Sequence, residues 1–240
     1  MRYLISISYD GSKFNGFQRL KENNSVQELI EKALTKINKS PVIIKGAGRT
    51  DRGVHALDQK AHFDLNINIT EEGLKKAINS FVKPYVYIKD CIQVNDDFHA
   101  RFNVIEKKYV YKINNVEYNP ILSDYFYFEK NKLDIEAMKE ASKVFLGVHN
   151  FKNFVSGERD NYEAIIYNIN FLEKDRIIEI EFTGKSFYRY MVRNLVGALI
   201  EVGKGKINKD YIINMLENYD KKKILPTAPS CGLYLKSIKY

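Results

Sequence analysis

Hydrophobic and polar residues alternate at the start of the chain, which predicts a β-strand. Side chains from Tyr3 to Tyr9 fall on two faces with a period of two, and Asp10-Gly11-Ser12 ends the pattern. Ser25 and Glu28 have the spacing of a helix capping box. The apolar residues after this box recur every three or four positions, which predicts an amphipathic helix: Val26, Leu29, Ile30, Ala33, Leu34 and Ile37.

The rest of the first half predicts two strands, a helix and a strand. Residues 41–45 and 60–65 have strand patterns, and residues 85–88 begin another strand. A helix is predicted to begin at Thr70, with this apolar face: Leu74, Ala77, Ile78 and Phe81. The order β-α-β-β-α-β is that of the ferredoxin-like split βαβ arrangement. No RNP1 string of an RNA recognition motif is present.

A second α+β half begins near residue 104, so the sequence indicates two halves, residues 1–103 and 104–240. The elements expected in it are strands at 107–113, 164–172, 177–183 and 233–238 and helices at 134–147, 187–202 and 209–217. No linker rich in Pro, Gly or Ser separates the halves, so we expect tight packing with a cleft between them. The expected fold class is α+β, with antiparallel sheets in two ferredoxin-like halves.

Composition narrows the function classes. The chain has 240 residues and a formal net charge of +8, which suits an anionic partner such as nucleic acid. The four histidines are scattered, and Cys91 and Cys231 form no CxxC pattern, so we expect no metal site. No apolar run approaches the roughly 20 residues of a membrane helix, and the N-terminus reads as a strand without a signal peptide. We therefore expect a cytoplasmic protein with no membrane partner.

The most informative segment is residues 46–56, Gly-Ala-Gly-Arg-Thr-Asp-Arg-Gly-Val-His-Ala. It places the carboxylate of Asp51 between Arg49 and Arg52, and nearby cations favour the charged form of an acid. A positioned carboxylate can serve as a nucleophile. Asp-Arg-Gly on its own is more often a hairpin turn with two solvated arginines, so the specificity lies in the whole string.

This string closely resembles the Gly-Arg-Thr-Asp-x-Gly-Val-His-Ala signature of the tRNA pseudouridine synthase A family. Four further segments resemble family motifs in the family's order: residues 9–19, 98–111, 191–194 and 227–235. Together the motifs run from Ser8 to Leu235, which is nearly the whole chain. The chain departs from the usual pattern at Phe17, where relatives more often carry Trp, and at Arg52, where many carry Ala.

The resemblance implies roles for four residues. Asp51 corresponds to the family's catalytic nucleophile, and Tyr109 to the tyrosine that stacks on the target base and is proposed to take part in proton transfer. Arg193 corresponds to the arginine thought to pair with the catalytic carboxylate, and Arg49 is a second cation that could keep Asp51 ionised and aimed. From the residues alone, Tyr109 would be an ordinary sheet aromatic and Arg193 a solvated helical charge.

The resemblance also implies the reaction. It is the isomerisation of uridine to pseudouridine at positions 38–40 of the tRNA anticodon arm, by a homodimer and without cofactor or metal. Two other classes stay open at this point. One is a non-catalytic RNA-binding protein on a ferredoxin-like scaffold. The other is an N-glycosidase-like hydrolase, which would release free uracil.

Overall fold

The computed structural model describes residues 1–19, 24–220 and 225–240, and the chain divides into two compact units. Unit 1 comprises Met1–Ile105 and Tyr234–Tyr240, and unit 2 comprises Glu106–Leu233. The last strand, β10 (Leu233–Lys239), thus lies mostly in unit 1, although the sequence pattern placed it in the second half. It pairs with β3 in parallel, with Tyr234 opposite His55, and no local pattern reports such a long-range pairing.

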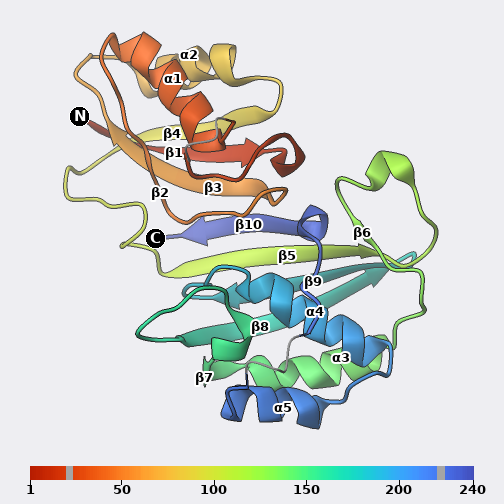
Figure 1. Ribbon diagram of the computed structural model, residues 1–240. Helices are drawn as coiled ribbons and strands as arrows, with labels where there is room; N and C mark the ends of the chain where they lie inside the picture. The colour runs from red at the N-terminus through yellow and green to blue at the C-terminus, as the bar shows by residue number, and fades with distance from the viewer. Residues whose placement is uncertain (20–23, 221–224) are drawn as a thin grey trace. The chain divides into compact units, whose positions relative to one another are not determined.

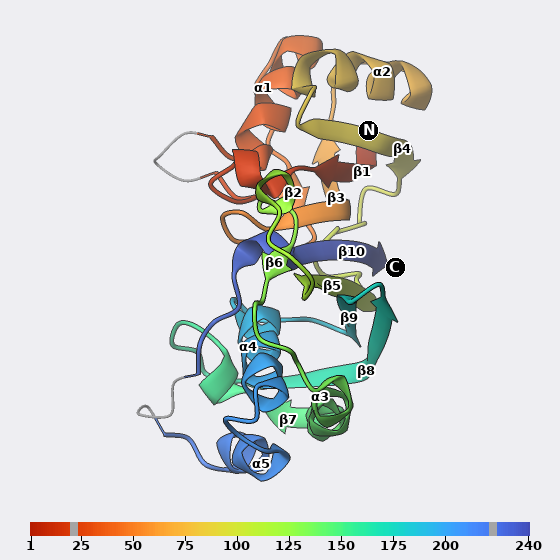
Figure 2. The same cartoon turned by 90° about the vertical axis from the view of Figure 1, so that its right-hand side faces the viewer.

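Unit 1 has the split βαβ order that the sequence predicted. Its elements are β1 (Arg2–Tyr9), the 3₁₀ turn η1 (Gly11–Lys13), α1 (Val26–Asn38), β2 (Lys45–Gly46), β3 (His55–Asp64), α2 (Glu71–Val82) and β4 (Val86–Val94). Strand β1 is antiparallel to both β3 and β4, and β2 pairs with β3. Helices α1 and α2 lie on one face of this sheet (Figures 1 and 2).

Both helices of unit 1 begin at hydroxyl caps. The hydroxyl oxygen of Ser25 accepts a bond from the Glu28 amide at 3.2 Å, and that of Thr70 accepts one from the Gly73 amide at 3.2 Å. These bonds satisfy amide groups that a helix leaves unpaired at its start. The apolar face predicted for α2 is wrong at Phe81, whose side chain is exposed. The face that packs inward instead carries Leu74, Ile78 and Val82.

The strand expected at residues 41–45 is shorter in the structure, where only Lys45–Gly46 pairs with β3. Val42 and Ile44 are still buried, so the alternation is real. The amide of Ile44 donates to the Glu31 carboxylate at 3.0 Å. A side chain from α1 therefore takes the place of a neighbouring strand.

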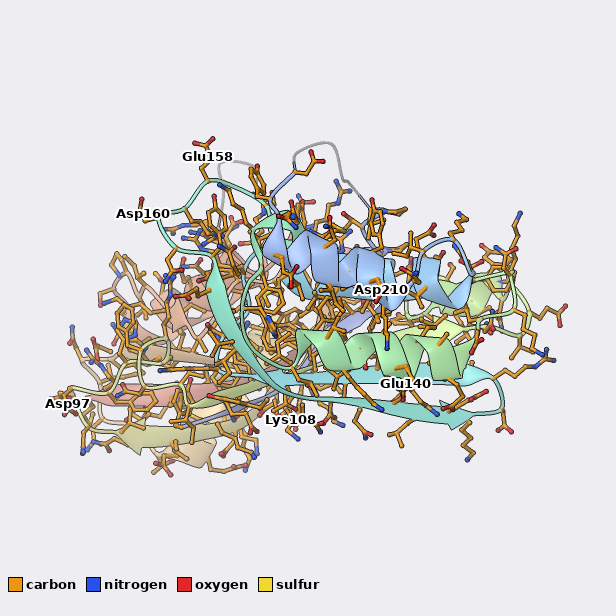
Figure 3. All side chains as sticks on the ribbon, turned by 90° about the horizontal axis from the view of Figure 1, so that it is seen from below. Asp97, Lys108, Glu140, Glu158, Asp160 and Asp210 are labelled. Carbon is orange, nitrogen blue, oxygen red and sulfur yellow. The ribbon has the colours of Figure 1, made fainter. Side chains whose placement is uncertain are left out.

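Unit 2 is a second α+β unit. Its strands are β5 (Glu106–Asn114), β6 (Tyr127–Phe128), β7 (Gly147–Asn150), β8 (Glu163–Lys174) and β9 (Ile177–Gly184). Its helices are α3 (Ile135–Ser142), α4 (Met191–Gly203), α5 (Lys209–Glu217) and the 3₁₀ turns η2 (Pro120–Leu122), η3 (Lys143–Phe145), η4 (Lys152–Phe154) and η5 (Ser230–Gly232). The sheet order is β5-β9-β8-β7 with antiparallel neighbours, and β6 joins β5 in parallel. Figure 3 shows α3, labelled at Glu140, and α5, labelled at Asp210, on the same side of the β8–β9 hairpin.

Two helices of unit 2 are shorter than predicted. The helix expected at 134–147 ends at Ser142 and passes into η3, and Gly147 already begins β7. The helix expected at 187–202 begins only at Met191, because Tyr190 adopts a left-handed conformation with φ of 63°. Arg189 therefore precedes the helix and does not share a helical face with Arg193.

The prediction of an α+β fold with mostly antiparallel strands is confirmed. Cys91 is buried and Cys231 is half-buried, and burial raises the pKa of the Cys91 thiol to about 12. Within residues 1–19, 24–220 and 225–240, no cluster of His, Cys, Asp or Glu could hold a metal ion. Over the same ranges no helix is long and apolar enough to cross a membrane.

Candidate active site

Asp51 lies at the start of a tight turn that joins β2 to β3. The amide of Val54 donates to the Asp51 carbonyl at 3.1 Å, and Gly53 has φ of 79°, a value that favours glycine. At the other end of the loop, the side-chain amide of Gln59 on β3 donates from Nε2 to the Gly48 carbonyl at 3.0 Å. One bond closes the turn and the other ties the loop to β3, so the half-buried side chain of Asp51 projects from a fixed backbone position.

A second segment, Gly11–Phe17, supports this loop at close range. A Cβ on Gly11 would lie 2.0 Å from the carbonyl oxygen of Val54, so only glycine fits. Gly16 has φ of 104°, and a Cβ there would lie 2.8 Å from the carbonyl oxygen of Thr50. That same oxygen accepts a bond from the Phe17 amide at 3.2 Å. The first motif of the sequence thus holds the backbone on which Asp51 is carried.

Thr50 is also fixed through its side chain. Its hydroxyl lies 2.8 Å from the hydroxyl of Tyr9, in a hydrogen bond that is fully buried. Burial raises the pKa of Tyr9 to about 12, although bonds to Thr50 and Gln59 lower it in part. Tyr9 therefore remains a neutral phenol at physiological pH, and its role here is to hold Thr50.

His55 is a supporting residue whose role the sequence interpretation missed. It is buried, its Nδ1 accepts the Gly11 amide at 3.1 Å, and the same nitrogen lies 3.4 Å from an oxygen of Asp10. Its ring stacks on Tyr234 at 4.6 Å between centroids. The ring therefore links the Asp51 loop, the Gly11 turn and β10. A histidine just after the Asp51 turn was visible in the sequence, but its partners Asp10, Gly11 and Tyr234 come from distant segments.

Arg49 lies two residues before Asp51 in the same loop, and its side chain is exposed. The structure thus brings Arg49 and Asp51 together in unit 1. Tyr109 and Arg193, the other two predicted site residues, belong to unit 2.

Tyr109 lies on β5, opposite Phe182 of β9. Its side chain is buried and meets Phe187 edge to face, with ring centroids 5.3 Å apart. The preceding residue, Lys108 (labelled in Figure 3), alternates to the other face of the strand. Its Nζ lies 3.2 Å from a carboxylate oxygen of Glu181. Tyr109 is therefore an oriented ring next to the segment that leads into α4.

Arg193 lies in the first turn of α4 and is half-buried. Its Nε donates to the Ala228 carbonyl at 2.7 Å, and the Ala228 amide donates back to the Arg193 carbonyl at 3.1 Å. The strap Pro226–Ala228 approaches the helix so closely that a Cβ on Gly197 would lie 1.8 Å from the Pro226 carbonyl oxygen. Arg193 is thus a positioned guanidinium, not the freely solvated charge that is usual on a helix.

The sequence that forms these two sets of residues matches a known protein family. The model of a family described as tRNA pseudouridine synthase matches residues 5–103 and 141–240. The chain belongs to the tRNA pseudouridine synthase family. Arg49, Asp51 and Arg193 fall within the matched ranges, and Tyr109 falls between them.

Several curated members of the tRNA pseudouridine synthase family are similar over their full length. The chain is 41% identical to tRNA pseudouridine synthase A of Pseudothermotoga lettingae, over 100% of this chain and 99% of the relative. It is 39% identical to the enzyme of Staphylococcus carnosus, over 99% of this chain and 90% of the relative. It is 36% identical to tRNA pseudouridine synthase A 2 of Bacillus cereus, over 99% of each chain. Among solved structures, an archaeal box H/ACA sRNP Nop10-Cbf5 complex has a TM-score of 0.38, with 82% of this chain and 43% of that chain covered.

Proposed function

We propose that the chain isomerises uridine to pseudouridine in tRNA, with Asp51 as the catalytic carboxylate. Membership of the tRNA pseudouridine synthase family supports an isomerase that acts on tRNA. The observation that carries the role of Asp51 is the construction of its loop. Two glycines, a buried Tyr9–Thr50 bond and a turn at Gly53 all fix the backbone that carries this carboxylate. Such preorganisation is what a reacting group needs.

The reaction rearranges bonds within one nucleotide. The N1–C1′ bond breaks, the uracil rotates, C5 bonds to C1′, and the hydrogen of C5 is replaced by one on N1. Atoms balance without an added reactant, so side chains alone suffice. Asp51 can serve in three ways: attack on the base, attack on the sugar, or removal of a proton from C2′. All three require it ionised.

Tyr109 is proposed to stack on the target uracil. A base must leave its helical stack to react, at a cost of a few kcal/mol. Stacking on an aromatic ring contributes about 1–3 kcal/mol per base and offsets part of that cost. The edge-to-face contact with Phe187 orients the Tyr109 ring before any base arrives. In the same proposal, Arg193 orients the Asp51 carboxylate, and Arg49 helps to keep that carboxylate ionised. A double-mutant cycle between Arg193 and Asp51 would test the role of Arg193.

The finer parts of the proposal concern substrate and assembly. The target uridines are positions 38–40 of the anticodon arm, the protein acts as a homodimer, and it works in the cytoplasm. The net charge of +8 supports a polyanionic substrate and predicts salt-dependent affinity. Sedimentation at several protein concentrations tests the dimer independently of activity.

The deciding experiment maps pseudouridine in unmodified tRNA transcripts by carbodiimide labelling and primer extension. Wild type is compared with Asp51→Asn and with Asp58→Asn, which makes the same change on β3 outside the loop. We expect new stops in the anticodon arm with wild type and Asp58→Asn, and none with Asp51→Asn although it still binds tRNA. Binding without stops by wild type would support the RNA-binding alternative, and release of free uracil would support the hydrolase.

A further inference from the structure

Tyr190 has an unusual backbone conformation. Its φ is 63° and its ψ is −6°, in the left-handed region that bulky side chains disfavour. Among the described residues, the other non-glycine positions with positive φ are polar or charged: Asn24, Lys39, Asp175 and Arg176. Tyr190 also stands at the N-cap of α4, where its side chain makes no capping hydrogen bond. The left-handed backbone and the missing side-chain cap both make the start of α4 less stable.

The ring of Tyr190 lies against two guanidinium groups. The Arg189 Cζ is 4.9 Å and the Arg193 Cζ is 5.0 Å from the ring centroid, distances typical of cation–π contacts. The backbone on either side is fixed as well. The Tyr190 carbonyl accepts the Asn194 amide at 2.9 Å, and the Met191 amide donates to the Tyr188 carbonyl at 3.1 Å. The ring therefore has a defined place beside Arg193.

Arg193 is thereby held at two points. The Ala228 carbonyl fixes its Nε at 2.7 Å, and the Tyr190 ring contacts the end of the same guanidinium. A single hydrogen bond at Nε leaves the guanidinium able to swing about that bond, whereas a second contact limits this motion. Strain in a backbone persists at a functional site when it sets the geometry of a reacting group.

We propose that Tyr190 is a positioning residue that orients Arg193 for the isomerisation, and that the left-handed backbone is the cost of placing its ring there. The inference rests on the role proposed above for Arg193. Tyr190 would act through Arg193, without contacting the target base or Asp51 itself.

The test uses substitutions that move stability and activity in opposite directions. Asn tolerates the left-handed conformation better than Tyr, so Tyr190→Asn should raise the melting temperature by about 2–4 °C. The same change removes the ring beside Arg193, so kcat on tRNA should fall about tenfold, with KM unchanged. Tyr190→Phe keeps the ring and should recover most of kcat. In an Arg193→Lys background, Tyr190→Asn should cause little further loss.

A matched control separates relief of strain from loss of the ring. Arg176 has φ of 58° in the β8–β9 turn, so Arg176→Asn should also raise the melting temperature and leave kcat unchanged. A Tyr190→Asn variant with wild-type kcat would overturn the inference while the proposed function stood. A higher KM with unchanged kcat would overturn it too, since Tyr190 would then bind tRNA directly. A wild-type protein that forms no pseudouridine would instead refute the proposed function itself.

Discussion

A Cβ on Gly16 would lie 2.8 Å from the carbonyl oxygen of Thr50, the residue that precedes Asp51. The two segments are far apart in the sequence, yet their backbones are in contact. Thr50 cannot move away freely, because its hydroxyl is bonded to Tyr9 and its carbonyl to the Phe17 amide. The position of the turn that carries Asp51 thus depends on the absence of a side chain at Gly16.

We predict that Gly16→Ala lowers kcat by about tenfold to a hundredfold, because the added methyl group displaces Thr50 and with it Asp51. Misplacement of a reacting group by about 1 Å can cost about a hundredfold in rate. The positive φ of Gly16 adds a stability loss of about 1 kcal/mol. Single-turnover rates and thermal melts measure the two effects separately.

Gly147→Ala is the matched control, since Gly147 has φ of 91° and no atom within 4 Å of the added Cβ. It should lose similar stability and keep its rate. Equal rates for the two variants would show that the contact with Thr50 is unimportant for catalysis.

The amphipathic patterns predicted most elements of unit 1, because period and caps are local properties. Ser25 and Thr70 mark helix starts that the structure retains. The prediction failed where contacts with residues distant in the sequence determine burial or strand pairing. Phe81 is apolar, but it lies at the exposed edge of α2, where the Nζ of Lys36 is 5.3 Å from its ring centroid. Residues 41–44 alternate like a strand, but Glu31 takes the hydrogen bond that a strand would supply.

The candidate site was predictable only as far as its motifs extend. The string around Asp51 predicted the candidate nucleophile. The segment around Gly11 and Gly16 was recognised as a motif, but the structural purpose of its two glycines was not predicted. That purpose is to allow a contact between backbones, which no periodicity reports. The start of α4 could not be predicted either, because no glycine or proline lies in residues 187–190 to mark a boundary, and the left-handed backbone of Tyr190 leaves no signal in the sequence.

A buried ionic cluster in unit 2 predicts acid sensitivity. Glu129 is 3% exposed, and its carboxylate lies 2.7 Å from Lys204 and accepts bonds from Tyr127 at 2.8 Å and from the Asn131 amide at 2.9 Å. Burial alone would raise the pKa of Glu129, but the bonds from Lys204, Asn131 and Tyr127 outweigh it and lower the pKa to about 2. On acidification, the Glu129 carboxylate therefore takes up a proton near pH 4.5 in the unfolded chain but only near pH 2 in the folded protein.

The free energy of unfolding should thus fall as pH drops from about 4.5 to 2. We predict that Glu129→Gln lowers the free energy of unfolding by about 3–5 kcal/mol at pH 7, because it leaves Lys204 without its main partner. The same change should weaken the dependence of this free energy on pH between about 4.5 and 2. Glu140→Gln, on the exposed face of α3, is the control and should leave the stability close to that of wild type. Urea unfolding at pH 7 and pH 3 gives these values, and a Glu129→Gln variant as stable as wild type would contradict the prediction.

His62 predicts a second loss of stability at a higher pH. Its side chain is 1% exposed, its Nδ1 accepts the Ala100 amide at 3.0 Å, and its ring lies 4.6 Å from that of His99. Burial, followed by the positive charges of His99, Arg2 and Lys45, lowers the pKa of His62 to about 4, against a weaker opposite effect of Asp64. Below pH 6.5 the unfolded state binds a proton that the folded state binds only near pH 4, so stability falls across that interval.

The loss between pH 6.5 and 4 should amount to roughly 2–4 kcal/mol. His62→Gln is the decisive variant, because its amide oxygen can still accept the Ala100 bond while the side chain cannot titrate. We expect its unfolding free energy to vary less over this interval than that of wild type, whereas His149→Gln, which removes a half-buried histidine of unit 2, should behave as wild type. Urea unfolding at half-unit steps of pH provides the measurement. A wild-type curve that is flat from pH 6.5 to 4 would show that His62 is protonated in the folded protein with little penalty. A slope that persists in His62→Gln would show that groups other than His62 cause the effect.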